Sequence, residues 1–457
     1  MSIIKQEAAV ARSLLIRGGG VITMDPKVGD LQSGDILIRD GVIQDVAPDI
    51  AADDAQVIDA GSMIVTPGFI DGHRHLWEGV IRNTLPTEDL EGYLRLVNNG
   101  FAQVYTPEDA YIGTLVSALG ALDAGVTTVF DWAHIQTTPE HTRATLQALR
   151  DSGLRAVFGF GPPGRQDQGH RWPQDLLRLR KEEFASDGLV TLGLAGLSPE
   201  HVPYEMAKAQ FELAREAGVI ISAHAALNGM GESGQIERFG REGLLGPHVN
   251  LVHCNTLSRE EWRMMADAGV SVSITPSTEM QMGQGVPPIQ PALDVGIKPS
   301  LGVDVETSTP GEMWTQMRVI YALQRSQAFE VRYAGGEPPR MMDLTDLLEL
   351  VTSAGARCIG LDSKVGSISP GKRADLMLLR CDLLNVMPVN DLKGAVALNM
   401  DARNVDTVLV DGRVVKRAGK MVGVDIDRLA ARLYESRERV FRDAKLPCGS
   451  PRTRFRE

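Results

Sequence analysis

Cysteine is scarce in this chain of 457 residues, and long apolar runs are missing. The four cysteines, Cys254, Cys358, Cys381 and Cys448, show none of the spacings of a zinc ribbon or a small disulfide-rich domain, which favours a reducing compartment. No apolar run reaches the ~18 residues of a membrane-spanning helix, and the N-terminus lacks the apolar core of a signal peptide. We therefore expect a cytoplasmic protein without a membrane partner.

Positive charge is also in short supply. The chain carries 47 lysines and arginines against 59 acidic residues, a formal net charge of −12, and has no basic stretch. The lack of such a stretch argues against a nucleic-acid backbone as a partner. The 43% of hydrophobic and 23% of charged residues are usual for a globular protein, and the length suits one large α/β domain with a smaller unit beside it.

The middle of the chain, from about residue 65 to about 370, alternates short apolar runs with amphipathic segments. Segments 204–218 and 258–269 are typical of helices that end at glycine, and they are followed by apolar runs. This repetition predicts stacked βα units, as either a closed barrel or an open parallel sheet. The expected buried strands are 125–132, 153–160, 189–197, 218–225, 250–255, 269–276 and 297–305.

The polar residues at the strand ends distinguish the barrel from the open sheet. A parallel barrel gathers its chemistry from the carboxyl ends of many strands, whereas an open sheet concentrates it near one switch point. Because the polar residues here follow many different strands, we predict a (β/α)8 barrel. They are His73, His75, Asp131, His224, His253 and Asp304.

The two ends of the chain resemble each other. Segments 34–48 and 405–421 both alternate apolar residues around an Asp-Gly pair, the pattern of a hairpin with a type I′ turn. We expect four parts: an N-terminal β-rich segment, the barrel, a C-terminal β-rich segment, and a final amphipathic helix with a tail. Their expected bounds are 1–64, 65–370, 371–424 and 425–457.

Two histidines one residue apart indicate a metal site. On a strand, His73 and His75 project from one face and Arg74 from the other. A barrel advances roughly 30 residues per βα unit. His224 and His253 are 29 residues apart and Asp304 follows 51 later, which places these three at the ends of strands 5, 6 and 8. Three imidazoles and a carboxylate leave a coordination position open, as in catalytic sites.

Five segments carry a resemblance to the amidohydrolase superfamily, in the branch of the cytosine deaminases, S-adenosylhomocysteine deaminases and triazine chlorohydrolases. They are PGFIDGHRH (67–75), ISAHA (221–225), LVHC (251–254), SLGVD (300–304) and GSISPGKRADLMLL (366–379). The resemblance spans nearly the whole chain. It implies that the two β-rich ends form one small β-sandwich beside the barrel.

The resemblance also implies roles for the strand-end residues. His73, His75, His224 and Asp304 would hold one divalent metal, with zinc expected and Fe²⁺, Co²⁺ or Mn²⁺ also compatible. His253 would polarise the substrate, and Asp304 would relay the proton of a metal-activated water. Superfamily members with two metals use a lysine on strand 4. Segment 189–197 has no lysine, so a single metal is expected.

Three positions depart from the branch and bear on the substrate. Leu227 stands where its deaminases have a glutamate, Thr256 stands where they have a second histidine, and His201 is out of register with theirs. The loss of the glutamate favours hydrolysis of an amide, urea, carbamate or ring-substituent C–N bond in a small aromatic or heterocyclic molecule. Deamination of a nucleobase-like heterocycle is the alternative. A non-catalytic scaffold is disfavoured because all the ligands are present.

Loops after the strands are expected to contact the small-molecule substrate. The candidates are Trp77, Arg82, Trp132, His134, Glu279 and Met280. Segment 161–175, with Arg165, His170 and Trp172, is a candidate lid, and His141 is expected to be exposed on a helix. The resemblance further implies a homo-oligomer.

Overall fold

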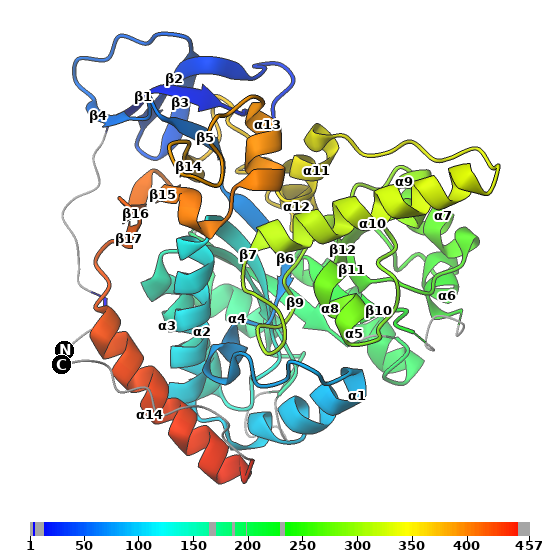
Figure 1. Ribbon diagram of the computed structural model, residues 1–457. Coiled ribbons are helices and arrows are strands. Elements are labelled where there is room, and N and C mark those ends of the chain that lie inside the picture. The colour runs from blue at the N-terminus through cyan, green and yellow to red at the C-terminus, as the bar shows by residue number, and fades with distance from the viewer. Residues whose placement is uncertain are drawn as a thin grey trace.

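The structure, a computed structural model, describes residues 3–4, 13–163, 171–184, 188–197, 199–228 and 234–446. Within them the chain forms two sheets, a barrel and a second sheet built from both ends of the chain (Figure 1). The tail 447–457 and the lid candidates Arg165 and His170 lie outside the described residues.

The barrel consists of eight parallel strands in sequence order. It closes where the loop after the last strand meets the first strand. There Asp304 N–H donates to the His73 carbonyl and His75 N–H donates to the Asp304 carbonyl, both at 2.9 Å. The predicted (β/α)8 barrel is confirmed. Its strands are β6 (Phe69–Arg74), β7 (Val126–Ala133), β8 (Arg155–Phe160), β9 (Val190–Gly196), β10 (Ile221–Ala225), β11 (Val249–His253), β12 (Ser271–Ile274) and β13 (Ser300–Leu301).

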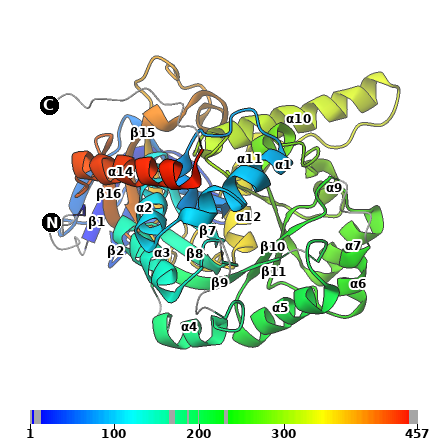
Figure 2. The same cartoon turned by 90° about the horizontal axis from the view of Figure 1, so that it is seen from below.

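Helices surround the barrel (Figure 2). The prediction that two helices end at glycine is confirmed for α5 and α7. Their C-cap residues, Gly218 and Gly269, take left-handed φ values of 60° and 73°. The helices are η1 (Leu76–Ile81), α1 (Leu90–Tyr93), η2 (Leu94–Asn98), η3 (Phe101–Val104), α2 (Pro107–Asp123), α3 (Pro139–Ser152), α4 (Leu176–Glu183), α5 (Tyr204–Ala217), α6 (Gln235–Arg241), α7 (Arg259–Ala268), α8 (Pro276–Gln281), α9 (Ile289–Asp294), α10 (Met313–Tyr333), α11 (Leu344–Leu350) and α12 (Ser353–Cys358).

The second sheet joins the two ends of the chain, as expected. Strand β14 pairs antiparallel with β5, so that residues before and after the barrel share one mixed sheet. Its strands are β1 (Ser13–Val21), β2 (Leu31–Arg39), β3 (Val42–Ala47), β4 (Gln56–Asp59), β5 (Met63–Pro67), β14 (Leu376–Arg380), β15 (Val405–Val410), β16 (Arg413–Arg417) and β17 (Lys420–Met421). The short α13 (Leu392–Gly394), η5 (Ala395–Asn399) and η6 (Ala402–Asn404) lie between β14 and β15.

Both predicted Asp-Gly turns have the positive φ angles of type I′. The values are 48° and 77° at Asp40 and Gly41, and 55° and 73° at Asp411 and Gly412. The two turns also pack on each other, since a Cβ on Gly41 would lie 2.4 Å from the Asp411 carbonyl oxygen. The equivalent turns from the two ends of the chain therefore meet.

Polar contacts fix the terminal elements on the barrel. Arg155, the first residue of β8, forms ion pairs with Asp375 at 2.6 Å and with Asp411 at 3.0 Å. The last helix, α14 (Ile426–Ala444), runs beside α2 in both ribbon views, and its Ser436 donates to Asp109 at 2.5 Å. As expected of an amphipathic helix, it packs on the outside of the barrel.

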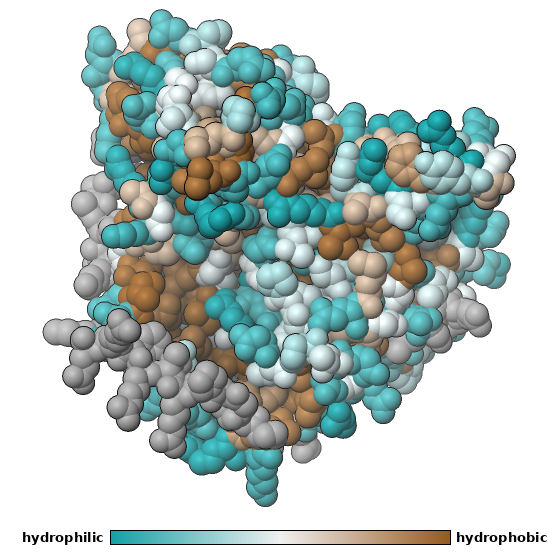
Figure 3. All heavy atoms as spheres, viewed as in Figure 1, coloured by the Kyte–Doolittle hydropathy of each residue, from teal (hydrophilic) through white to brown (hydrophobic). Residues whose placement is uncertain are grey.

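The surface is mixed in character. Figure 3 shows mostly hydrophilic and neutral residues on one face, with hydrophobic residues in patches. Searching the described helices finds none that is both long and apolar enough to cross a membrane. Cys254, Cys358 and Cys381 are free thiols, and Cys448 lies outside the described residues.

Candidate metal centre and its cavity

The five strand-end residues lie where the sequence spacing places them. Counting β6 as the first barrel strand, His73 is on strand 1 and His75 directly follows it. His224 is on strand 5, His253 ends strand 6, and Asp304 follows strand 8. The predicted placement on strands 1, 5, 6 and 8 is confirmed.

The backbone of two of these residues is strained. His253 and Asp304 have φ values of 74° and 67°, in the left-handed region that side chains other than glycine rarely adopt. Such a conformation costs about 1–2 kcal/mol per residue and clusters at functional sites. Here it coincides with the two residues expected to act on the substrate.

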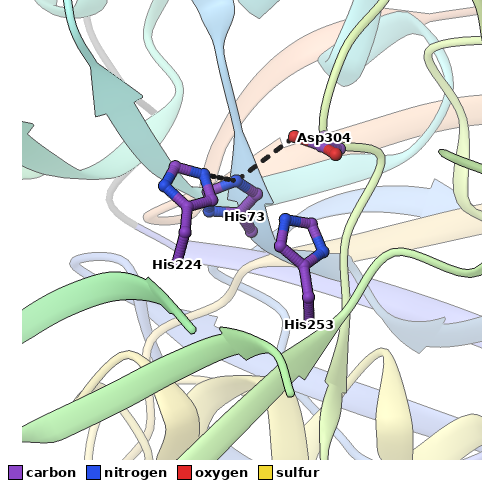
Figure 4. Close-up of side chains that lie close together, drawn as sticks. All are labelled: His73, His224, His253 and Asp304. Carbon is purple, nitrogen blue, oxygen red and sulfur yellow. Dashed lines mark hydrogen bonds and ion pairs between the residues drawn. The ribbon is translucent and has the colours of Figure 1, made fainter. Parts of the chain in front are cut away.

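The side chains converge on one point (Figure 4). Ligand atoms of His73, His224, His253 and Asp304 all lie within 4.8 Å of one another. The Nε2 atoms of His73 and His75 each lie 3.3 Å from the same oxygen, Oδ1 of Asp304. His224 Nε2 lies 3.2 Å from His73 Nε2.

This donor set fits a divalent cation. Burial lowers the pKa of His73 to about 4 and lowers that of His224 well below its usual value, so both imidazoles are neutral. Burial alone would raise the pKa of Asp304, but the neighbouring His73 and His75 hold it well below its usual range. A divalent cation between them would accept a lone pair from each of the two neutral rings and from the Asp304 carboxylate.

Outer contacts orient two of the rings. His75 Nδ1 lies 2.8 Å from the carbonyl oxygen of Trp132, which turns Nε2 toward Asp304. His253 Nδ1 lies 3.2 Å from Oε1 of Glu279, and that oxygen also accepts from the backbone of Thr275 at 2.8 Å. Partners of this kind fix the tautomer and direction of metal-site histidines.

A cavity of about 270 Å³ opens beside the cluster. Among the described residues that line it, Asp304 is the only carboxylic acid, and none is lysine or arginine. The volume falls just below the roughly 300–1,000 Å³ of sites for drug-sized ligands. Its lining residues are His75, Leu90, Tyr93, Leu94, Asn98, Trp132, His134, Leu197, His201, His224, Leu227, His253, Met282, Gln284, Asp304 and Val305.

Two of the six expected substrate contacts, Trp132 and His134, line this cavity. Glu279 stands behind it, against His253. Trp77 is fully buried and its indole nitrogen lies 3.2 Å from His134. Met280 is 44% exposed and is not among the lining residues.

Arg82 is directed away from the cavity. Its guanidinium pairs with Glu306 and donates to the Val116 carbonyl at 3.1 Å. Arg74, buried on the opposite face of β6 from the histidines, also pairs with Glu306. Although burial would raise the pKa of Glu306, Arg74 and Arg82 lower it to about 2. These residues border a separate cavity of about 500 Å³.

Several lining residues have no signature in the sequence. Tyr93 and Asn98 lie on α1 and η2, in a segment without a strand end, and the Tyr93 hydroxyl donates to Glu78 at 2.6 Å. Gln284 follows α8. His201 borders the cavity even though it is out of register in sequence.

The expected exposure of His141 is wrong. Its side chain is 2% exposed, because Nδ1 lies 2.9 Å from Thr138 Oγ1 and Nε2 lies 3.2 Å from the Tyr105 carbonyl. Both ring nitrogens thus have hydrogen-bond partners, one just before α3 and one just before α2. These bonds compensate for the loss of hydration when the ring is buried. Trp172 of the candidate lid donates to the Phe160 carbonyl at 3.0 Å.

A profile described as the amidohydrolase family matches residues 64–415, most of the chain. The chain belongs to this family. The predicted superfamily is thereby confirmed, and with it the prediction of a hydrolase acting on carbon–nitrogen bonds.

Relatives and solved structures agree with this assignment. The 5-methylthioadenosine/S-adenosylhomocysteine deaminase of Desulforudis audaxviator is 28% identical over 93% of this chain and 99% of its own. An adenosine deaminase of Xanthomonas campestris with bound zinc has a TM-score of 0.80 at 21% identity, covering 93% of this chain and 98% of its own. An atrazine chlorohydrolase of Arthrobacter aurescens complexed with zinc has a TM-score of 0.81 at 24% identity, covering 93% and 100%. At these identities the two solved structures establish the fold.

Proposed function

We propose that this amidohydrolase uses one divalent metal ion to hydrolyse an amide, urea, carbamate or ring-substituent C–N bond at an sp² carbon of a small, uncharged aromatic or heterocyclic molecule. The observation that carries the proposal is the convergence of histidines and Asp304 at the wall of a 270 Å³ cavity whose described lining has no other carboxylic acid and no lysine or arginine. Without a lysine or arginine to balance it, an anionic substrate group away from the metal would be desolvated at a cost.

The proposed ligands are His73, His75, His224 and Asp304. The Nε2 atoms of His73 and His75 lie 3.3 Å from Asp304 Oδ1, and the Nε2 atom of His224 lies 3.2 Å from that of His73. The metal, zinc being the expected one, supplies positive charge and lowers the pKa of a water molecule.

Asp304 moves the proton in this proposal. Its carboxylate borders both the histidine cluster and the cavity, so it can accept the proton of the attacking water and return it to the leaving nitrogen. His253 faces the same space, and Glu279 behind it supports positive charge on the ring as negative charge builds up on the substrate.

Deamination of an amino-substituted heterocycle is the second candidate. It is favoured by the relatives of this chain, which are named deaminases. Against it, Leu227 lines the cavity and among the described residues no carboxylic acid besides Asp304 borders it to protonate a ring nitrogen.

A paired product screen tests the proposal. Purified protein of known metal content is offered amino-substituted heterocycles and, separately, N-acyl, urea and carbamate derivatives of similar ring compounds, with ammonia and product mass recorded. Turnover of the second set alone supports the first candidate, and ammonia release from the first set supports deamination. An Asp304→Asn variant that turns over compounds as fast as the wild type, or a metal-free protein that does so, would contradict the proposal.

A further inference from the structure

His134 stands at the cavity wall with one ring nitrogen already committed. It follows β7 directly, and its ring centroid lies 4.5 Å from that of His75. The indole Nε1 of Trp77 lies 3.2 Å from His134 Nδ1. An indole N–H only donates, so this contact requires a lone pair on Nδ1.

A competing contact is weaker. His134 Nδ1 also lies 3.4 Å from the Trp132 carbonyl oxygen, which would accept a proton placed on Nδ1. That oxygen is already held by His75 Nδ1 at 2.8 Å. Protonating Nδ1 would in addition leave the N–H of the fully buried Trp77 facing a second donor, which costs about 1–3 kcal/mol. The proton of neutral His134 therefore resides on Nε2.

The Nε2 atom is the polar atom that His134 offers to the cavity. The side-chain hydrogen bonds of His134 within the described part of the chain both use Nδ1, and His134 lines the same cavity as Asp304 and Leu227. The cavity thus presents a fixed N–H donor close to the cluster of histidines.

We propose that His134 is a specificity-determining donor: its Nε2–H binds an acceptor atom next to the carbon under attack, and Trp77 is the positioning residue that holds the tautomer. The inference rests on the proposed function. It names the substrate class more closely, as a ring or acyl compound with an sp² nitrogen or carbonyl oxygen adjacent to the reacting carbon. An analogue with C–H at that position leaves the donor unpaired.

The N–H bond of His134 stays intact throughout. A neutral imidazole is a very weak acid, so Nε2–H stabilises charge on the acceptor atom through a hydrogen bond while the transferred proton travels by way of Asp304. This division of labour needs no second carboxylic acid, in agreement with Leu227 in the lining.

The tautomer is tested first, in the resting full-length metal-loaded enzyme. Long-range ¹H–¹⁵N spectra of ¹⁵N-histidine-labelled protein report which ring nitrogen carries the proton, and a His134→Gln sample identifies the signal. We expect Nε2–H in the wild type and a loss of the single tautomer in Trp77→Phe, which keeps an aromatic ring and removes the donor. A proton on Nδ1 in the wild type would overturn the proposal whether or not any substrate is found.

Kinetics test the contact with substrate. The most rapidly hydrolysed compound of the screen is compared with its analogue in which the adjacent ring nitrogen is replaced by C–H, or the carbonyl by CH₂. We expect His134→Phe to lower kcat/KM about 100-fold for the parent and to leave the analogue unchanged. His134→Gln, which can place an amide N–H near the position of Nε2, should restore at least tenfold of that loss.

Equal losses for parent and analogue, or unchanged kinetics in His134→Phe at wild-type metal content, would refute the role of His134. If no compound of the screen is hydrolysed, the proposed function fails, and the tautomer measurement still decides whether Trp77 fixes His134.

Discussion

Asp304 combines a strained backbone, two histidine neighbours and a place in the cavity wall. Asp304→Asn keeps the size of the side chain and removes its capacity to carry a proton. We expect kcat to fall by about 10²–10⁴-fold, with an unchanged circular dichroism spectrum. A variant within threefold of wild-type kcat would contradict the assignment.

A variant of His253 tests whether this residue acts on the substrate or binds the metal. We expect His253→Ala to lose about 10²-fold or more in kcat while keeping its metal, because His73, His75, His224 and Asp304 remain. Metal content per chain, measured by mass spectrometry after dialysis, is the decisive readout. Loss of the metal would make His253 a ligand, and Glu279→Gln then serves as the matched variant that keeps the His253 ring and changes the group at its Nδ1.

Among single residues, the sequence predicts those whose spacing follows the βα repeat of the barrel. An HxH pair and the spacing of His224, His253 and Asp304 follow from the period of a barrel. Arg82 and Met280 follow strand ends too, yet they turn to Glu306 and to the surface. The direction of a side chain in a loop depends on packing partners far away in the chain, which spacing does not encode.

The next scale is that of elements, where the packed hairpin turns allow a matched comparison. Gly41 and Gly29 have similar positive φ values, 77° and 75°. A Cβ on Gly41 would clash with the Asp411 carbonyl, whereas a Cβ on Gly29 meets no atom within 4 Å. We expect Gly29→Ala to cost about 1 kcal/mol from backbone strain alone, and Gly41→Ala to cost a further 1–3 kcal/mol from overpacking.

Urea unfolding of both variants checks this expectation. Equal losses would show that the two turns do not press on each other in solution. A loss confined to Gly41→Ala would instead mean that positive φ itself is cheap in these turns.

Elements with strong periodicity are predicted from sequence, and those without it are missed. The seven expected barrel strands and the helices α5 and α7 are all present. The cavity wall formed by α1 and η2 is not expected, because these segments are single turns of mixed helix type. A single helical turn is too short to show a repeat of apolar residues in the sequence. It is stabilised by the barrel on which it lies.

For the whole molecule, the joint between barrel and terminal sheet depends on charge. Burial would raise the pKa of Asp411, but Arg373 and Arg155 lower it below its usual 3.8. A carboxyl with a depressed folded pKa stabilises the fold fully above its unfolded pKa, and that contribution declines below this value and is lost as the pH falls through the folded pKa. Because Asp411 is only half-buried, solvent screens its ion pairs, and Asp411→Asn should lose about 1 kcal/mol at pH 7 and progressively less below pH 4.

Chemical unfolding at pH 7, 5 and 3.5 measures this dependence. Asp382→Asn is the control, because Asp382 forms an exposed ion pair with Arg380 and should change little at any of these pH values. A loss in Asp411→Asn that is the same at pH 7 and 3.5 would rule out an ionic origin.

Because the terminal sheet pairs strands from both ends of the chain, its strands are synthesised at very different times. Strand β5 ends at Pro67 and its partner β14 begins at Leu376, so the whole barrel is synthesised between them. At roughly 5–20 residues per second, that interval is on the order of 15–60 s. Throughout it, β1 to β5 have emerged while one edge of their sheet stays unpaired and open to other chains. The nascent protein is therefore exposed to mispairing until β14 is made.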